Sequence, residues 1–198
     1  MKNKKSVLAL TTTAMLGAVA TILMMLEFST PFMPGFIKFD FSELPGVFAA
    51  IAISPASGVL VCLIKNAVHL IVTTTGGIGE VANFILGAAF VLTTGYLYRY
   101  IKDKKLSLVV SGVTGSLAMA IVSLPVNYYL TYPVYSKMLP IDAIIGMYAE
   151  LNPSVNSLFE ALLIFNVPFN FIKGVICVVI AAILYKSVKP LFKKFETK

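Results

Sequence analysis

Long apolar runs, broken by short polar or Gly/Pro segments, make up most of the chain. Runs of about 20 apolar residues are typical of transmembrane helices, because a helix needs that length to cross the hydrocarbon core of a bilayer. The pattern predicts six helices, at 6–28, 43–54, 56–74, 79–101, 107–131 and 157–187. The second is short for a span, since Pro55 disfavours the helical conformation at Ser54, and we expect it to be tilted or partly inserted.

The composition agrees with a membrane protein. Of the 198 residues, 58% are hydrophobic and only 13% are charged, whereas about 25% are charged in a soluble domain. The apolar run that follows Lys5 is too long for the core of a signal peptide, so we interpret it as a retained first helix. We therefore predict an all-α integral membrane protein, with residues 1–198 forming a single membrane domain.

The basic residues cluster at the ends of three predicted helices, which predicts the topology. They are Lys2, Lys4 and Lys5 before the first helix, Arg99, Lys102, Lys104 and Lys105 between the fourth and fifth, and Lys186, Lys189, Lys193, Lys194 and Lys198 after the sixth. The positive-inside rule places all three clusters, and so both termini, in the cytoplasm. The net charge of +7 then reflects topology and does not indicate a nucleic-acid partner.

Two connections on the opposite side are long. The segment 29–42 contains several phenylalanines and is predicted either to fold over the bundle like a lid or to sit in the headgroup region. The segment 132–156 is predicted to be a loop. Long ordered loops are usually functional, so a pocket that opens on this extracellular side is expected.

Polar side chains within the predicted helices are candidates for function, because such groups are costly at membrane depth unless they are paired. They are Lys65, Asn66, His69, Glu80, Asn83, Asn127, Asn166, Asn170 and Lys173. Asn166, Asn170 and Lys173 follow an i, i+4, i+7 spacing, which places them on one helix face. Amides together with a lysine suit a flat, uncharged ring with alternating N–H and C=O groups; hydrogen bonding between helices is the alternative.

The only histidine, His69, leaves three roles open: a proton relay, a ligand contact or a structural hydrogen bond. The first would fit an alternative function, a stand-alone ion-coupled secondary transporter in which His69 or Glu80 titrates. The glycine-rich segment 73–80 follows a helix and lacks the Lys-Ser/Thr of a nucleotide-binding loop, and no catalytic motif is present. Cys62 and Cys177 lie in apolar runs and suggest neither a disulfide nor a metal site. We expect no enzyme activity, no cofactor and no metal.

The first helix has small residues at four-residue spacing, including the pairs Thr13 and Gly17, and Ala14 and Ala18. Such spacing allows another helix to approach closely. That helix belongs either to the same bundle or to a second membrane protein.

Several segments together resemble a known family, the riboflavin-specific substrate-binding (S) components of bacterial energy-coupling factor (ECF) transporters. The resemblance is carried by residues 38–45, residues 58–66 with His69, the pair Asn83-Phe84, residues 127–129, and residues 165–174. It extends over most of the chain. The segment 132–156 matches no pattern of that family, and a ligand contact there from Glu150 is only a hypothesis.

The resemblance implies a function and a set of partners. It implies a multi-pass protein of the bacterial plasma membrane that binds riboflavin, with FMN as a possible second ligand, in a six-helix bundle whose outer pocket is covered by the segment 29–42. It also implies partnership with a transmembrane coupling protein and two cytoplasmic ATPases, which would dock on Ala14 and Ala18. The ligand-binding residues predicted from the sequence and the resemblance together are Asn127, Asn170, Lys173, Asn83, Asp40, Phe39, Glu80 and Asn166.

Overall fold

The computed structural model describes residues 2–101 and 104–192. Four basic residues used to predict the topology lie outside these ranges: Lys102, Lys193, Lys194 and Lys198. The side chains of six more are likewise outside the described part, those of Lys2, Lys4, Lys5, Lys104, Lys105 and Lys189.

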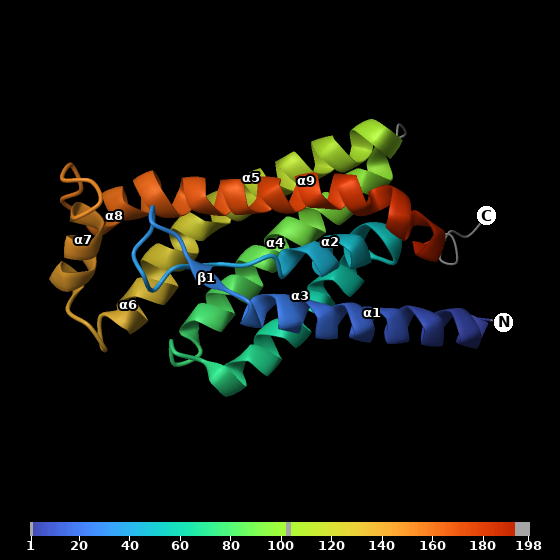
Figure 1. Cartoon of the computed structure of the whole chain (residues 1–198), viewed down its shortest axis with the longest axis horizontal. Coiled ribbons are helices and arrows are strands. Elements are labelled where there is room, and N and C mark those ends of the chain that lie inside the picture. The colour runs from blue at the N-terminus through green and yellow to red at the C-terminus, as the bar shows by residue number, and fades with distance from the viewer. Residues whose placement is uncertain (1, 102–103, 193–198) are drawn as a thin grey trace.

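The described chain is a bundle of long helices (Figure 1). The elements are α1 (Lys2–Met25), β1 (Phe28–Ser29), β2 (Lys38–Phe39), α2 (Glu43–Ala52), α3 (Pro55–His69), the 3-10 turn η1 (Leu70–Val72), α4 (Ile78–Tyr100), α5 (Lys104–Val126), the π-helical turn η2 (Asn127–Thr131), α6 (Tyr132–Tyr135), α7 (Ile141–Ala149), α8 (Leu158–Ala161), the π-helical turn η3 (Leu162–Asn166) and α9 (Val167–Phe192). The N-terminal end of α1 and the C-terminal end of α9 lie at the same end of the bundle, and α7 lies at the other.

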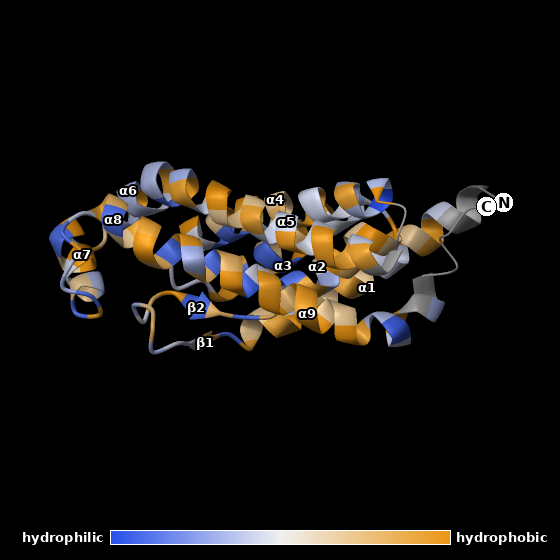
Figure 2. Ribbon diagram, turned by 90° about the horizontal axis from the view of Figure 1, so that it is seen from above, coloured by the Kyte–Doolittle hydropathy of each residue, from blue (hydrophilic) through white to orange (hydrophobic). Residues whose placement is uncertain are grey.

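Five helical stretches of the described residues are long and apolar enough to cross a membrane: Ser6–Met25, Pro55–Val72, Ile78–Tyr100, Leu106–Tyr135 and Leu158–Val188. Many of their large apolar side chains are exposed, including Leu10, Ile121 and Ile183, each more than 60% exposed. Exposed apolar surface on this scale needs lipid or another protein to cover it. Figure 2 shows hydrophobic positions along the whole length of the helices.

The second predicted helix, at 43–54, is much shorter than the other five. Helix α2 has ten residues, which corresponds to about 15 Å, half of the hydrocarbon core. It packs against α1, α3, α4 and α9 and buries eight of its ten residues. Helix α2 is therefore a central element enclosed by longer helices. Ile53 and Ser54 separate it from α3, which begins at Pro55 and whose first turn is capped by the Ser54 hydroxyl accepting from the Ser57 amide at 3.0 Å.

The two long connections contain secondary structure that the sequence pattern did not predict. Residues 28–42, called the hairpin segment below, contain β1 and β2, which form a short antiparallel hairpin in which Phe28 pairs with Phe39. The segment 132–156, predicted as a loop, contains α6 and the nine-residue helix α7. The prediction of a long loop there was wrong, because Ile141, Ile144, Ile145 and Tyr148 form an apolar helical face that packs on the bundle.

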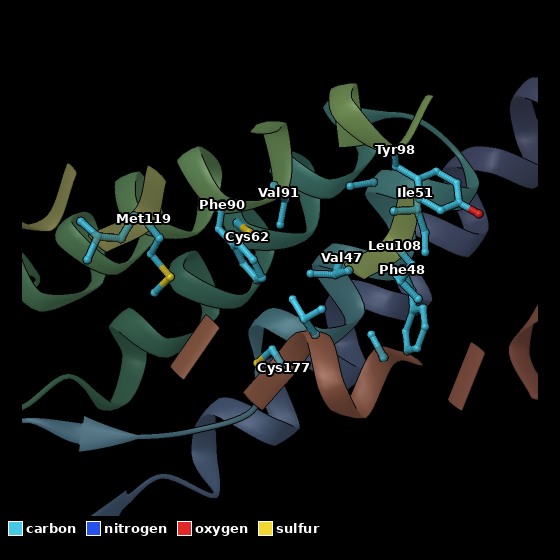
Figure 3. Packing of buried hydrophobic residues seen from close by; sticks show 14 residues of the cluster. Val47, Phe48, Ile51, Cys62, Phe90, Val91, Tyr98, Leu108, Met119 and Cys177 are labelled. Carbon is cyan, nitrogen blue, oxygen red and sulfur yellow. The ribbon is translucent and has the colours of Figure 1, made fainter. Parts of the chain in front are cut away.

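The largest buried cluster of the described residues joins α2, α3, α4, α5 and α9 (Figure 3). Its members include Val47, Cys62, Phe90, Met119 and Cys177. A second cluster, around Tyr132, Ile144, Tyr148 and Leu162, lies beside α7. The space between these clusters holds most of the polar residues predicted to be functional.

Candidate functional site

A cavity of about 170 Å³ opens between the hairpin segment, α4, η2, η3 and α9. That volume is far above the roughly 10–15 Å³ that a single water needs. Seven of the eight predicted ligand-binding residues line it: Asp40, Glu80, Asn83, Asn127, Asn166, Asn170 and Lys173. These residues lie far apart in the sequence, so the fold brings together the polar groups that the sequence indicated one by one.

Two π-helical turns aim the asparagines into the cavity. Asn127 begins η2 and Asn166 ends η3, and each turn lies beside a proline, Pro125 before η2 and Pro168 after η3. Proline has no N–H to donate to the helix, so the backbone around it readily takes up an irregular turn. π-helical turns often occur at functional sites, and here they occur in the two spans that supply the cavity with most of its amides.

Lys173 and Asp40 form an ion pair across the cavity wall. Lys173 Nζ lies 2.8 Å from Asp40 Oδ2, and both side chains are at most 5% exposed. The other carboxylate oxygen of Asp40 accepts from the Ser42 amide at 2.7 Å. Burial alone would raise the pKa of Asp40, but the charges of Lys173 and Lys65 outweigh it and hold this pKa well below its ordinary value. Asp40 therefore fixes the end of the hairpin segment to α9.

A second ion pair lies behind the first, outside the cavity. Lys65 Nζ contacts Glu43 Oε1 and Ser42 Oγ, both at 2.6 Å, and the Lys65 and Glu43 side chains are fully buried. A Cβ at Gly87 would lie only 2.7 Å from Glu43 Oε2, so the glycine makes room for the carboxylate. Lys65 was a candidate functional residue, and the structure pairs it with Glu43 inside the bundle.

Glu80 lines the cavity but is strongly engaged by the protein. His69 Nδ1 contacts Glu80 Oε1 at 2.9 Å, and the hydroxyls of Thr73 and Thr75 both donate to Glu80 Oε2 at 2.9 Å. The turn that carries the threonines uses Gly76 and Gly77, which have positive φ angles of 64° and 88°. Of the three roles left open for His69, the geometry favours the structural hydrogen bond.

The asparagine amides are the groups with spare hydrogen-bonding capacity. Asn170 Nδ2 donates to the Asn166 carbonyl at 2.8 Å, which leaves its amide oxygen available. Asn83 and Asn127 also line the cavity, and Asn127 is only 8% exposed. Within the described part of the chain, neither side chain has a hydrogen-bond partner. Buried amides are rarely left unpaired, so these three side chains are suited to meeting a ligand.

A ring of hydrogen bonds at one end of the cavity was missed by the sequence analysis. Tyr148 donates to Asn166 Oδ1 at 2.7 Å, Asn166 Nδ2 donates to the Tyr132 hydroxyl at 3.4 Å, and the two tyrosine hydroxyls bond to each other. Burial raises the pKa of Tyr148 far above its ordinary value, so its hydroxyl stays protonated. Phe36 of the hairpin segment packs edge-on against Tyr132, Tyr135 and Tyr148.

Two predicted contacts do not reach the cavity. Phe39, the eighth predicted ligand-binding residue, lines a separate apolar groove of about 540 Å³ beside α9, where it packs against Phe28, Phe41 and Phe169. The reason is strand alternation, because β2 directs Lys38 and Phe39 to opposite sides. Glu150 lies just after α7, is exposed and does not line the cavity; Tyr132 and Tyr135 are the residues of the segment 132–156 that line it.

The small residues of α1 divide between two faces. Thr13 and Gly17 are buried against the bundle, and a Cβ at Gly17 would lie 2.9 Å from Ile64 of α3. Ala14 and Ala18 are exposed on the other face. The first pair therefore serves packing within the bundle, whereas the second remains available to a partner.

Comparisons with known proteins agree on one family. Residues 8–185 match the family model described as "ECF transporter, substrate-specific component". The chain is 34% identical to "Riboflavin transporter FmnP" of Bacillus subtilis (strain 168), covering 96% of this chain and 94% of that protein. It is 30% identical to "Riboflavin transporter RibU" of Staphylococcus aureus (strain TCH60), covering 93% of this chain and 92% of that protein.

A solved structure gives the same result for the fold. It is described as the S component of a bacterial ECF transporter and superimposes with a TM-score of 0.75 at 28% identity, covering 98% of this chain and 99% of that one. The relatives are named as transporters, not as enzymes.

Proposed function

Since the chain belongs to the family of substrate-specific components of ECF transporters, we propose that it binds riboflavin in the bacterial plasma membrane for uptake driven by a separate ATP-hydrolysing module. The observation that carries this proposal is the cavity lined by Asn83, Asn127, Asn170 and Lys173. The names of the two relatives as riboflavin transporters support the choice of ligand.

The chemistry of the cavity suits a flavin. The pyrimidine edge of the flavin ring presents an imide N–H between two carbonyls. An asparagine amide offers both a donor and an acceptor, and Lys173 offers charge-assisted donors. We assign Asn127, Asn170 and Lys173 to this edge. Asn83, Asn166, Asp40 and Glu80 are assigned to the remaining polar groups, including the ribityl hydroxyls. FMN is a further candidate ligand.

The orientation in the membrane is also part of the proposal. The N-terminal end of α1, the C-terminal ends of α4 and α9 and the N-terminal end of α5 lie at the end of the bundle away from α7 (Figure 1). The predicted basic clusters occur at these same places in the chain, which supports a cytoplasmic location for that end. The cavity then opens toward the outside, under the hairpin segment, and α2 with its preceding residues takes the place of a sixth span.

Partners are inferred from family membership and from α1. Members of the family are components of larger transporters, and the exposed pair Ala14 and Ala18 offers a surface that a second helix can approach closely. We propose this face as the docking surface for a transmembrane coupling protein that carries two ATPase subunits.

Riboflavin binding tests the proposed function directly. The purified protein in detergent is expected to retain yellow riboflavin and, once stripped of it, to quench riboflavin fluorescence on titration. FMN and a non-flavin vitamin are titrated in parallel. A colourless protein that does not quench riboflavin fluorescence would overturn the proposal. Uptake into liposomes that contain this chain alone would instead favour a secondary transporter.

The role of Asn170 gives a more local prediction. Asn170→Ala is expected to weaken riboflavin binding by about 1–3 kcal/mol, because a buried polar group of the ligand would be left without its partner. The control is Asn156→Ala, since Asn156 is exposed and lies outside the cavity. Equal dissociation constants for the two variants would show that Asn170 does not contact the ligand.

A further inference from the structure

The hydrogen-bond ring at the α7 end of the cavity is closed, so it has a definite direction. Tyr148 comes from α7, Tyr132 begins α6 and Asn166 ends η3. Figure 1 shows α6, α7 and α8 together at this end of the bundle. The hydroxyl of Tyr148 donates to Asn166 Oδ1 at 2.7 Å, and Asn166 Nδ2 reaches the Tyr132 hydroxyl at 3.4 Å.

The number of protons settles the direction of the remaining bond. A tyrosine hydroxyl has one proton, and that of Tyr148 is used on Asn166. The bond between the two hydroxyls must therefore use the proton of Tyr132. The distances support the orientation of the amide, since 2.7 Å is typical of O–H···O contacts whereas 3.4 Å is long for any hydrogen bond.

The direction of the hydrogen bonds in the ring determines which donors and acceptors Tyr132 and Asn166 present to a ligand in the cavity. Tyr132 and Asn166 line the cavity, whereas Tyr148 does not. The Tyr132 proton points toward Tyr148, so its oxygen can only accept from the cavity side. Asn166 keeps its second N–H, which can only donate. Tyr132 and Tyr148 are at most 1% exposed, so bulk water does not compete for these bonds.

We propose that Tyr148 is a positioning residue for ligand recognition, which acts by fixing Tyr132 as an acceptor and Asn166 as a donor toward the cavity. This inference rests on the proposed function, in which the ligand is riboflavin. The riboflavin group opposite Tyr132 is then a donor, a ribityl hydroxyl or the imide N–H, and the group opposite Asn166 is an acceptor. Without the Tyr148 hydroxyl, the Tyr132 proton can turn toward the cavity and the Asn166 amide can flip.

Replacing Tyr148 with phenylalanine isolates this hydroxyl. The substitution keeps the aromatic ring, and with it the edge-on contact to Phe36 at 6.2 Å between ring centroids, so the hairpin segment keeps its packing. The matched control is Tyr129→Phe, which removes a hydroxyl from a side chain that is 76% exposed. Riboflavin dissociation constants are measured by fluorescence quenching for both variants, for Asn166→Ala, and for Tyr148→Phe combined with Asn166→Ala.

We expect Tyr148→Phe to lower the affinity for riboflavin, and we expect its effect to depend strongly on whether Asn166 is present. Tyr148→Phe is expected to raise the dissociation constant roughly tenfold, and Tyr129→Phe to leave it within about twofold. In the Asn166→Ala background, Tyr148→Phe is expected to add less than about twofold, because the ring is already open there and Tyr148 no longer fixes the direction of its bond with Tyr132. A merely structural role would not produce this coupling.

Three other outcomes overturn the inference. The first is a Tyr148→Phe variant that binds riboflavin as tightly as the Tyr129→Phe control. The second is a double variant in which the two losses multiply, since Tyr148 would then act independently of Asn166. The third is a wild-type chain that does not bind riboflavin, which overturns the proposed function as well. If Tyr148→Phe does not fold, Tyr148→Met replaces it in the same cycle, because methionine removes the same hydroxyl and leaves Tyr132 and Asn166, which line the cavity, unchanged.

Discussion

Lys65→Met is expected to lower the free energy of unfolding by about 3–5 kcal/mol, because it leaves the Glu43 carboxylate buried without a cation. Both side chains are fully buried and their charged atoms lie 2.6 Å apart. Methionine fills most of the space of the lysine, so a cavity contributes little to the loss. Thermal unfolding in detergent, followed by circular dichroism, measures the change; fluorescence is less suitable because the chain has no tryptophan.

The control for this prediction removes the second charge as well. Combining Lys65→Met with Glu43→Gln is expected to recover most of the lost stability, since no uncompensated charge remains. Lys137→Met changes an exposed lysine and is expected to alter stability by less than about 0.5 kcal/mol. If the double variant is as unstable as Lys65→Met alone, the loss comes from packing and not from the charge of Glu43.

Lys173→Met is expected to weaken riboflavin binding by about 1.5–3 kcal/mol, that is, roughly 10- to 150-fold in dissociation constant. Hydrogen bonds from a charged donor are stronger than those between neutral groups, and Lys173 is the only lysine on α9 that lines the cavity among the described residues. The same change leaves Asp40 without the partner that it contacts at 2.8 Å. Fluorescence titration and thermal unfolding together measure both effects.

The double variant separates binding from stability. Lys173→Met combined with Asp40→Asn is expected to unfold at a higher temperature than Lys173→Met alone, because the unpaired carboxylate is removed. It should not bind riboflavin more tightly, since the cationic donor is still absent. Restored affinity would mean that Lys173 serves only to neutralise Asp40, and would remove it from the set of ligand contacts.

Five of the six predicted membrane helices correspond to stretches of the described residues long enough to cross a membrane, because the apolar runs that cross a bilayer are long; the short helix at 43–54 is the exception. The candidate site was also largely predicted, since polar residues at membrane depth are rare enough to count individually. Seven of the eight predicted ligand-binding residues line one cavity. The exception, Phe39, faces away because β2 gives its residues alternate directions, and such a short hairpin leaves too few residues for a period of two to be recognised.

The pairing of Lys65 with Glu43 was not predicted, because Glu43 is the first residue of the predicted helix 43–54 and was not counted among the polar residues inside the helices. The contribution of α7 was missed for a different reason. Its nine residues are too short for a span, and the neighbouring prolines and polar residues suggested a loop. A signal was nevertheless present: Pro140 precedes an apolar face with i, i+3, i+4, i+7 spacing that ends at Tyr148.

The π-helical turns imply that the length of the chain is as important to the site as the identity of its residues. Each of these turns holds one residue more than an α-helical turn would. Deleting one residue within Leu162–Asn166 would allow a regular α-helix, and each residue of such a helix accounts for a rotation of about 100°. The part of the chain before the deletion, including α7, would then turn relative to Asn170 and Lys173. Every recognition group except the deleted residue would still be present, yet the two walls of the cavity would no longer face each other.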